Sequence, residues 1–254
     1  MGKLFKNLKP YWKSVLMIVV LLVVQAFCDL SLPQYTSDII DTGIQNSGVE
    51  HILPEKITAE EFQNAQLFMT ADEQKTWQDA YNGDGDILDR NDFSKKDLEQ
   101  FDSDLIVPIL LNYQMSMMSE DSFRELLAQQ QQGNPQAAEQ LKTMSIADIG
   151  NSMGVTLTPF ERTEEDDDGN QTTVTCVDVR PLFAAMQEAG QFTEETRSEM
   201  RSQLETMLDT MGESLVQSMG VAYAVQCDQA AGLDTNNIQT NYLWAAGGKM
   251  VAMA

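Results

Sequence analysis

Oxygen-bearing side chains are concentrated in one short segment, residues 82–92, which reads NGDGDILDRND. A calcium loop of the EF-hand type needs oxygen ligands at alternate positions, a glycine at the sharp turn and a carboxylate at the end. With Gly85 placed at the turn, the segment offers a set of candidate ligands for calcium. These are Asn82, Asp84, Asp86, Asp89 and Asp92.

The match to that loop is incomplete. Ala80 falls at the first ligand position and has no side-chain oxygen, and Asn91 falls at the last, where a bidentate acid belongs. Asp79 and Asp92 are each one residue out of register. The same residue types also favour an Asx or glycine turn, so an ordinary turn between two helices is the alternative.

Three cysteines and one histidine are the other residues with distinctive chemistry. Cys28 lies in an apolar stretch, whereas Cys176 and Cys227 lie in an acidic region and can pair as a disulfide if that region is outside the cytoplasm. His51 has no neighbouring cysteine or histidine, so no zinc site is expected. No nucleophile–base pair stands out, and we expect no enzyme activity in this chain.

Charge is distributed very unevenly along the chain. The formal net charge is −23, yet the first thirteen residues carry four lysines and no acid. From Glu50 to Thr240 there are 36 acids and 11 Lys or Arg, a net charge of 11 − 36 = −25. Such a region repels nucleic acid and anionic headgroups, which excludes nucleic acid as a partner. Cations and basic peptides remain, as does a purely solubilising role.

An apolar run follows the lysines and predicts a membrane-spanning helix. Val15 to Leu32 is 18 residues long with polar interruptions at Gln25 and Asp29, and a helix of that length spans roughly 27 Å, about the thickness of a bilayer core. The lysines place residues 1–13 in the cytoplasm and residues 14–50 across and beyond the membrane. A cleaved signal peptide and a soluble core helix are the alternatives.

Residues 51–235 are predicted to form an acidic, extracytoplasmic and mainly helical domain. Thr58 and Thr70 each precede a glutamate by three residues, at Glu61 and Glu73, the pattern of a capping box. Further helices are expected after Ser94, after Asp104 and after Ser119, and another from Gln136 to Met144.

Two other patterns stand out in this domain. The Val- and Thr-rich stretches 155–163 and 171–179 flank an acidic segment, which predicts a β-hairpin. Apolar residues at helical spacing from Met200 to Val225 predict one long helix from Thr193 to about Ala231, capped by Gly232. The expected fold class is therefore mainly α with one small hairpin.

The last residues, 236–254, become steadily more apolar. Tyr242 and Trp244 lie where interfacial aromatic residues are found in spanning helices. We expect this segment to be the start of a second spanning helix that continues beyond Ala254. An amphipathic tail is the alternative.

Both ends of the chain resemble one family, the type IV ABC exporters. At the N-terminal end the resemblance is carried by Lys9–Lys13, by Asp29–Pro33 and by Ser37–Ile44 with Gly48; at the C-terminal end it is carried by Ile238–Thr240, Tyr242, Leu243, Gly247, Lys249 and Met250. Together these segments cover about 65 residues and resemble the first two transmembrane helices of such exporters. A short loop joins those helices in most members, whereas here roughly 185 residues intervene.

The resemblance implies a fragment of an ATP-driven exporter in the plasma membrane, working with a second identical or different half-transporter, membrane lipid and an unidentified exported substrate. The ATP and Mg²⁺ of the family would bind to a domain outside this chain, because no G-x-x-x-x-G-K-[ST] phosphate loop occurs in it. A single-pass, membrane-anchored binding or sensor module is the alternative function.

Overall fold

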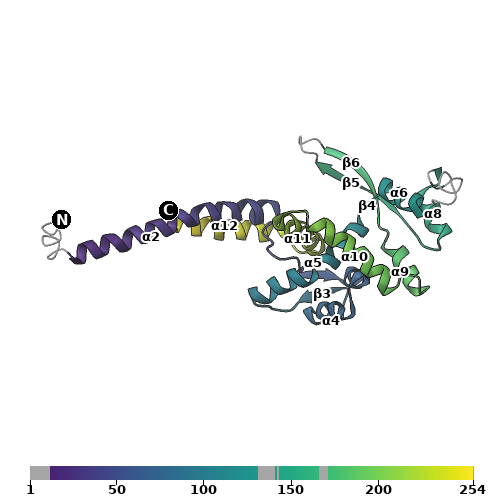
Figure 1. Cartoon of the computed structure of the whole chain (residues 1–254), viewed down its shortest axis with the longest axis horizontal. Coiled ribbons are helices and arrows are strands. Elements are labelled where there is room, and N and C mark those ends of the chain that lie inside the picture. The colour runs from purple at the N-terminus through teal and green to yellow at the C-terminus, as the bar shows by residue number, and fades with distance from the viewer. Residues whose placement is uncertain (1–11, 131–140, 142, 166–170, 254) are drawn as a thin grey trace. The chain divides into compact units, whose positions relative to one another are not determined.

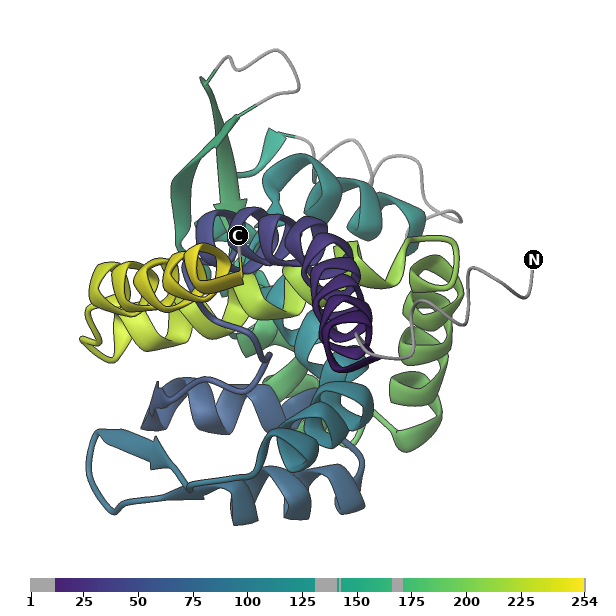
Figure 2. The same ribbon diagram turned by 90° about the vertical axis from the view of Figure 1, so that its left-hand side faces the viewer.

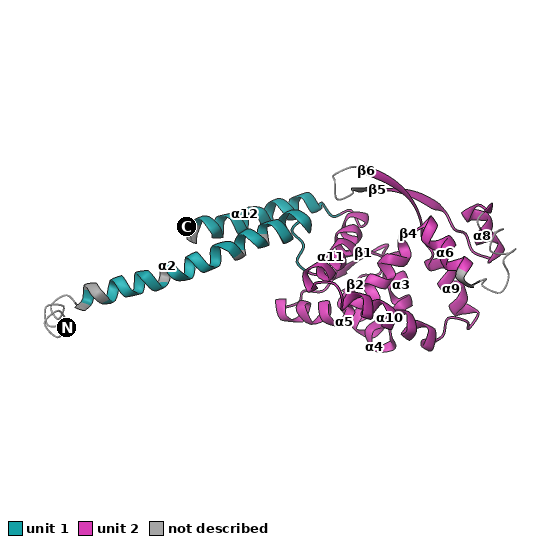
Figure 3. Ribbon diagram, turned by 45° about the horizontal axis from the view of Figure 1, so that its top comes forward, with its two compact units in different colours: residues 1–50, 233–254 teal, residues 51–232 magenta. Residues whose placement is uncertain are grey.

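The computed structural model describes residues 12–130, 141, 143–165 and 171–253. The lysines at positions 3, 6 and 9, most of the helix expected over 136–144 and the acidic hairpin tip lie outside the described residues. The structure is 69% helix and 11% strand, which confirms the mainly α fold class. The chain divides into two compact units, 1–50 with 233–254 and 51–232, coloured separately in Figure 3.

The first unit contains one long apolar helix. Helix α2 spans Trp12–Asp38 and continues directly into a π-helix, η2, over Ile39–Gln45. Residues 16–23 of α2 are each 52–64% exposed, and every one of them is apolar. The stretch Leu16–Gln45 is long and apolar enough to cross a membrane, and it is the only such helix among the residues that the structure describes.

Helix α2 passes through Pro33 without ending there. Proline has no backbone N–H to donate, so it removes one hydrogen bond of the helix. On either side, Ser31 Oγ donates to the carbonyl of Phe27 at 2.9 Å and Thr36 Oγ1 donates to that of Leu32 at 3.0 Å. Hydroxyls that bond to their own helix in this way need no water, which suits an apolar environment.

Helix α12, Thr235–Met253, runs beside the C-terminal part of α2 and η2 (Figure 1). Two glycines permit this close approach. A Cβ at Gly43 would lie 2.6 Å from Leu243 Cδ2, and a Cβ at Gly48 would lie 2.9 Å from the Cα of Gln239. In addition, Gln239 Nε2 donates to the carbonyl oxygen of Gly43 at 2.9 Å. Gly48 also has a φ of +81°, a conformation that other residues rarely adopt.

The second unit begins with a small sheet that no sequence pattern predicted. Strands β1 (Lys56–Thr58), β3 (Ile87–Arg90) and β2 (Tyr81–Asn82) pair antiparallel in the order β1-β3-β2. Helix α3 (Ala59–Ala65), the 3₁₀ turn η3 (Gln66–Phe68) and helix α4 (Ala71–Ala80) connect β1 to β2. The strands have only two to four residues, too few for period-2 alternation to be recognised.

The second sheet contains the predicted hairpin. Strands β5 (Pro159–Glu165) and β6 (Gln171–Val177) pair antiparallel, and β4 (Met118–Ser119) adds a third strand beside β6. The hairpin is therefore confirmed, with its first strand beginning a few residues later than the Val- and Thr-rich stretch at 155–163 suggested.

Two helix boundaries differ from those that the sequence predicted. Helix α5, Lys95–Ser116, is continuous through Asp104 and Pro108, so the two helices expected there are one. The single helix expected from Thr193 to Ala231 is wrong, because the chain forms α10 (Glu194–Leu208) and α11 (Glu213–Ala230). Gly212 has an extended conformation at the start of α11 and interrupts the helical hydrogen bonds. The second unit also contains α6 (Glu120–Gln130), α8 (Ile146–Ser152) and α9 (Arg180–Glu188).

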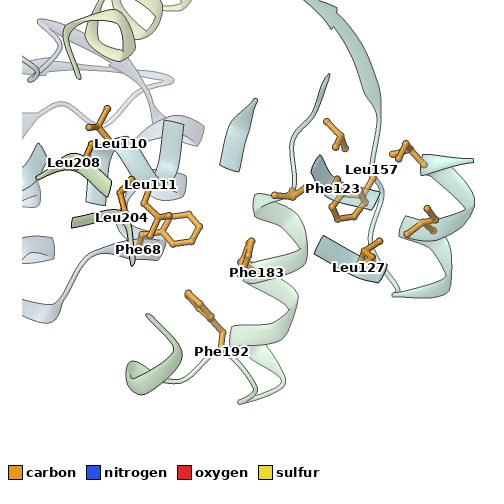
Figure 4. Close-up of a cluster of buried hydrophobic side chains, with 14 residues drawn as sticks. Phe68, Leu110, Leu111, Phe123, Leu127, Leu157, Phe183, Phe192, Leu204 and Leu208 are labelled. Carbon is orange, nitrogen blue, oxygen red and sulfur yellow. The ribbon is translucent and has the colours of Figure 1, made fainter. Parts of the chain in front are cut away.

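The core of the second unit joins these helices to the hairpin. Phe68 and Phe192 each pack edge-on against Phe183, with ring centroids 5.5 and 5.3 Å apart. Figure 4 shows Phe183 between a group from η3, α5 and α10 and a second group that includes Phe123 and Leu157. Figure 2 gives a view of the same elements from another side. Phe183 thus connects two parts of one apolar cluster.

We expect Gly48→Ala to loosen α12, because the new Cβ meets the backbone of Gln239 and the residue keeps an unfavourable φ. Hydrogen exchange of the full chain in detergent, read by mass spectrometry over residues 238–250, should become about tenfold faster or more, corresponding to a cost of about 1.4 kcal/mol or more.

Gly154→Ala is the matched control, since Gly154 has a φ of +77° and a Cβ placed there would meet no atom within 4 Å. It should leave exchange in 238–250 unchanged. Equal acceleration by both substitutions would show that the close approach is unimportant.

Candidate functional site

The predicted calcium ligands lie on a β-hairpin. Asn82 and Asp89 face each other across β2 and β3, while Asp84 and Asp86 are exposed in the connection between the strands. Asp89 Oδ1 accepts a hydrogen bond from Lys56 Nζ at 2.5 Å, and Asn82 Nδ2 donates to Asn91 Oδ1 at 2.6 Å. The segment therefore connects two strands, whereas both the EF-hand loop and the ordinary turn were expected between two helices.

Asp92 follows β3 in the chain and precedes α5. In the described part of the chain, no three Asp, Glu, His or Cys side chains form a group that could hold a metal ion. Calcium binding by these five residues stays a prediction from the sequence.

The cysteines are free thiols in the structure. Cys176 lies in β6 and Cys227 in α11, and both are buried, but the structure does not join them. Burial raises the pKa of the Cys227 thiol well above its ordinary value, and the nearby Glu61 carboxylate acts in the same direction. A thiol held in its neutral form is a poor nucleophile, so the environment favours a structural role for Cys227.

A buried ion network surrounds Arg180 at the start of α9. Its guanidinium binds both oxygens of Glu61 at 2.9 and 2.7 Å and both oxygens of Asp178 at 2.8–3.2 Å. Asn112, which is fully buried, accepts from Arg180 at 3.2 Å and donates to Glu61 at 2.8 Å. Burial lowers the pKa of the guanidinium, but Asp178 and Glu61 outweigh that effect and raise it above its ordinary value.

Glu61 has a different role from the one its position suggested. The Thr58 hydroxyl accepts from the Glu61 amide at 3.2 Å, as expected of a helix cap. The Glu61 carboxylate, however, binds Arg180 instead of closing a capping box. The box predicted at Thr70 and Glu73 is complete, by contrast. The sequence did not predict the network because its two main partners are 119 residues apart. The one indication in the sequence was that basic residues are scarce in this acidic region, so that each of them has several possible acidic partners.

A large cavity, of about 900 Å³, lies in the apolar part of the second unit. We call it the methionine cavity, because α5, α6, α9 and α10 line it mainly with thioether and aliphatic side chains. Its methionines are Met115, Met118, Met153, Met186, Met200 and Met207. The side chains that line it are uncharged, and flexible, polarisable methionines adapt to apolar molecules of different shape. The size is typical of small-molecule sites.

Asp228 is a fully buried acid on α11 that no sequence pattern singled out. Its Oδ1 accepts from the Lys56 amide at 2.7 Å, and no residue in the described part of the chain forms a hydrogen bond within ordinary distance limits to its Oδ2. Burial raises the pKa of Asp228 to about 6, because the Lys56 amide and Arg90 only partly offset the cost of desolvation.

Comparison of the chain with models of protein families, with curated proteins and with solved structures finds no match. The candidate sites therefore rest on the residues and geometry described above.

Asp228→Asn should stabilise the second unit at neutral pH. The folded state binds more protons than the unfolded state between the ordinary pKa of 3.8 and about 6, so stability falls as pH rises through that window. An uncharged asparagine removes this loss, worth on the order of 2–3 kcal/mol above pH 6.

Thermal unfolding of the full chain in detergent, followed by the fluorescence of the buried Trp77, checks this expectation. Asp228→Asn should raise Tm at pH 7.5 and much less at pH 4. The exposed Asp209→Asn is the control and should change neither value. A gain that is the same at both pH values would contradict the assigned cause.

The methionine cavity is expected to admit a small apolar molecule. Titration of benzene into the full chain labelled with ¹³C-methyl methionine should shift the signals of Met186 and Met200 but not that of Met69, which is buried elsewhere.

Two neighbouring alanines on α9 provide matched variants. Ala185→Leu fills the cavity and should abolish the shifts, whereas Ala184→Leu, outside the lining, should preserve them. Shifts that survive Ala185→Leu unchanged would mean that benzene binds somewhere else.

Proposed function

We propose that this chain is the N-terminal transmembrane part of a type IV ABC exporter that carries an extracytoplasmic domain formed by residues 51–232. In this proposal α2 and α12 are its first two membrane helices. The exporter works with a second half-transporter in the plasma membrane, and ATP and Mg²⁺ act in a domain outside this chain. Residues 1–13 lie in the cytoplasm.

One observation carries the proposal. The segments that resemble the exporters, 37–48 and 238–250, are far apart in sequence, and they pack directly on each other. Gly43 contacts Leu243 and Gly48 contacts Gln239, at distances that leave no room for a side chain. Two segments that resemble neighbouring helices of one family are therefore also neighbours within this chain.

The apolar surface of α2 supports the same function. Residues 16–23 present a continuous apolar surface that no other described residue covers. Exposure of such a helix to water is costly, and lipid or further membrane helices would remove that cost. A single membrane anchor would explain α2 equally well, but it gives no reason for α12 to pack against it.

The reading frame of the source gene beyond codon 254 tests the proposal. We expect further apolar spans followed by a G-x-x-x-x-G-K-[ST] phosphate loop. The encoded protein, purified in lipid, should hydrolyse Mg-ATP, and substitution of the phosphate-loop lysine should reduce the rate by at least about tenfold.

A stop codon after Ala254 in an intact gene would contradict the exporter proposal. The membrane-anchored binding or sensor module would then be the better interpretation of the chain.

A further inference from the structure

A second cavity, of about 390 Å³, lies beside the Arg180 network in the second unit. We call it the acidic cavity. It is lined by residues from β1, α3, α5, β5, α9 and α11, so segments from distant parts of the sequence meet around it. Its volume is within the range of small-ligand sites.

The charges of the ionisable groups that line the acidic cavity do not balance. Arg180 provides one positive charge, whereas Glu61, Asp178 and Glu60 provide three negative charges. Arg180 is bound by Glu61 and Asp178 together, which leaves that cluster with one net negative charge. Glu60 is exposed at the cavity and adds another. Uncompensated charge in a partly buried site is unfavourable, so a cation would stabilise it.

The hydrogen bonding of the Tyr223 hydroxyl is also incomplete. Tyr223 is 2% exposed and lines the acidic cavity, and among the described residues no nitrogen or oxygen atom forms a hydrogen bond with its hydroxyl oxygen. The hydroxyl donates only to the Cys227 thiol, and sulfur is a weak hydrogen-bonding group, so the acceptor capacity of the oxygen is unused. Buried hydroxyls are normally satisfied, and an unsatisfied one costs about 1–3 kcal/mol. A ligand with an N–H donor would satisfy the Tyr223 oxygen.

Aromatic rings form part of the cavity wall. Tyr113 packs edge-on against Tyr223 with ring centroids 5.9 Å apart, and Phe160 of β5 also lines the cavity. The faces of aromatic rings attract cations, and they also pack against the alkyl chain that carries a cationic group. Carboxylates and aromatic rings around one cavity therefore favour an organic cation over an anion.

We propose that the acidic cavity binds a primary alkylammonium group, with its charge near the carboxylates of Glu60 and Glu61 and one N–H donated to Tyr223. A free amine and the side chain of a lysine present the same chemistry. The site belongs to the second unit alone, so this assignment is independent of the exporter function.

The full chain labelled with ¹³C-methyl methionine provides the test, because Met117 lines the acidic cavity. Titration with n-butylammonium chloride should shift the Met117 signal to saturation. The neutral n-butanol and the anionic butyrate, at equal concentrations, should have little effect. N-acetyl-lysine N-methylamide forms a parallel arm, and tighter binding of it than of n-butylammonium would identify a lysine side chain as the source.

Two variants examine the groups in the proposed contact. Tyr223→Phe removes the hydroxyl and should weaken binding about three- to tenfold, while Glu60→Gln should weaken it about twofold or more. Because Glu60 is exposed, its substitution tests the proposal even if Tyr223→Phe disturbs folding. The matched controls are Tyr81→Phe, whose hydroxyl donates to the Pro54 carbonyl away from the cavity, and the exposed Glu199→Gln.

We expect the ammonium compounds to bind selectively. Tyr223→Phe and Glu60→Gln should weaken this binding, and the two control substitutions should leave it unchanged. Equal shifts of Met117 with n-butanol and n-butylammonium would overturn the proposal. Unchanged affinity in both Glu60→Gln and a folded Tyr223→Phe would overturn it as well.

Discussion

The contact between η2 with its following turn and helix α12 is the constraint on which the rest of the structure depends. Gln239 donates to the Gly43 carbonyl across 196 residues of chain, and Gly48 admits the backbone of Gln239 beside it. The region 51–232 lies between the two contacting segments in the chain, and the ends of inserted domains are usually close together. The entropy of closing a loop grows only slowly with its length, so a large folded unit can replace a short loop at modest cost.

The two units differ in the environment that they need to be stable. Helix α2 exposes apolar side chains over most of its length and needs an apolar environment. The second unit has its own core around Phe183 and contains the main polar groups of interest, so its stability does not rely on that environment. Within it, the lining of the methionine cavity is uncharged and that of the acidic cavity has excess negative charge, so the two cavities differ in the chemistry of their walls.

Local signals explain which parts of this structure could be predicted from the sequence. The cap at Thr193, the capping box at Thr70 and Glu73 and the β5–β6 hairpin each depend on residues close together in the chain, and each is confirmed. The prediction of one long helix through Gly212 was wrong. The apolar residues keep helical spacing across the break, so the spacing did not reveal it, and Leu215, counted among those residues, is 55% exposed. The spacing of residues in the sequence predicts neither the Arg180–Glu61 ion pair nor the environment of the Tyr223 hydroxyl, because the residues concerned are far apart in the chain and meet only in the folded protein.

The accessibility of single cysteines in intact cells tests most directly whether α2 and α12 form a membrane pair. In a background with Cys28 replaced by serine, a membrane-impermeant maleimide should label Asp84→Cys, on the exposed hairpin, from outside. Lys13→Cys should react only after permeabilisation, and Val251→Cys should stay unlabelled although its side chain is 79% exposed in the structure. If Val251→Cys instead reacts from outside as fast as Asp84→Cys, α12 lies in water and the account is contradicted.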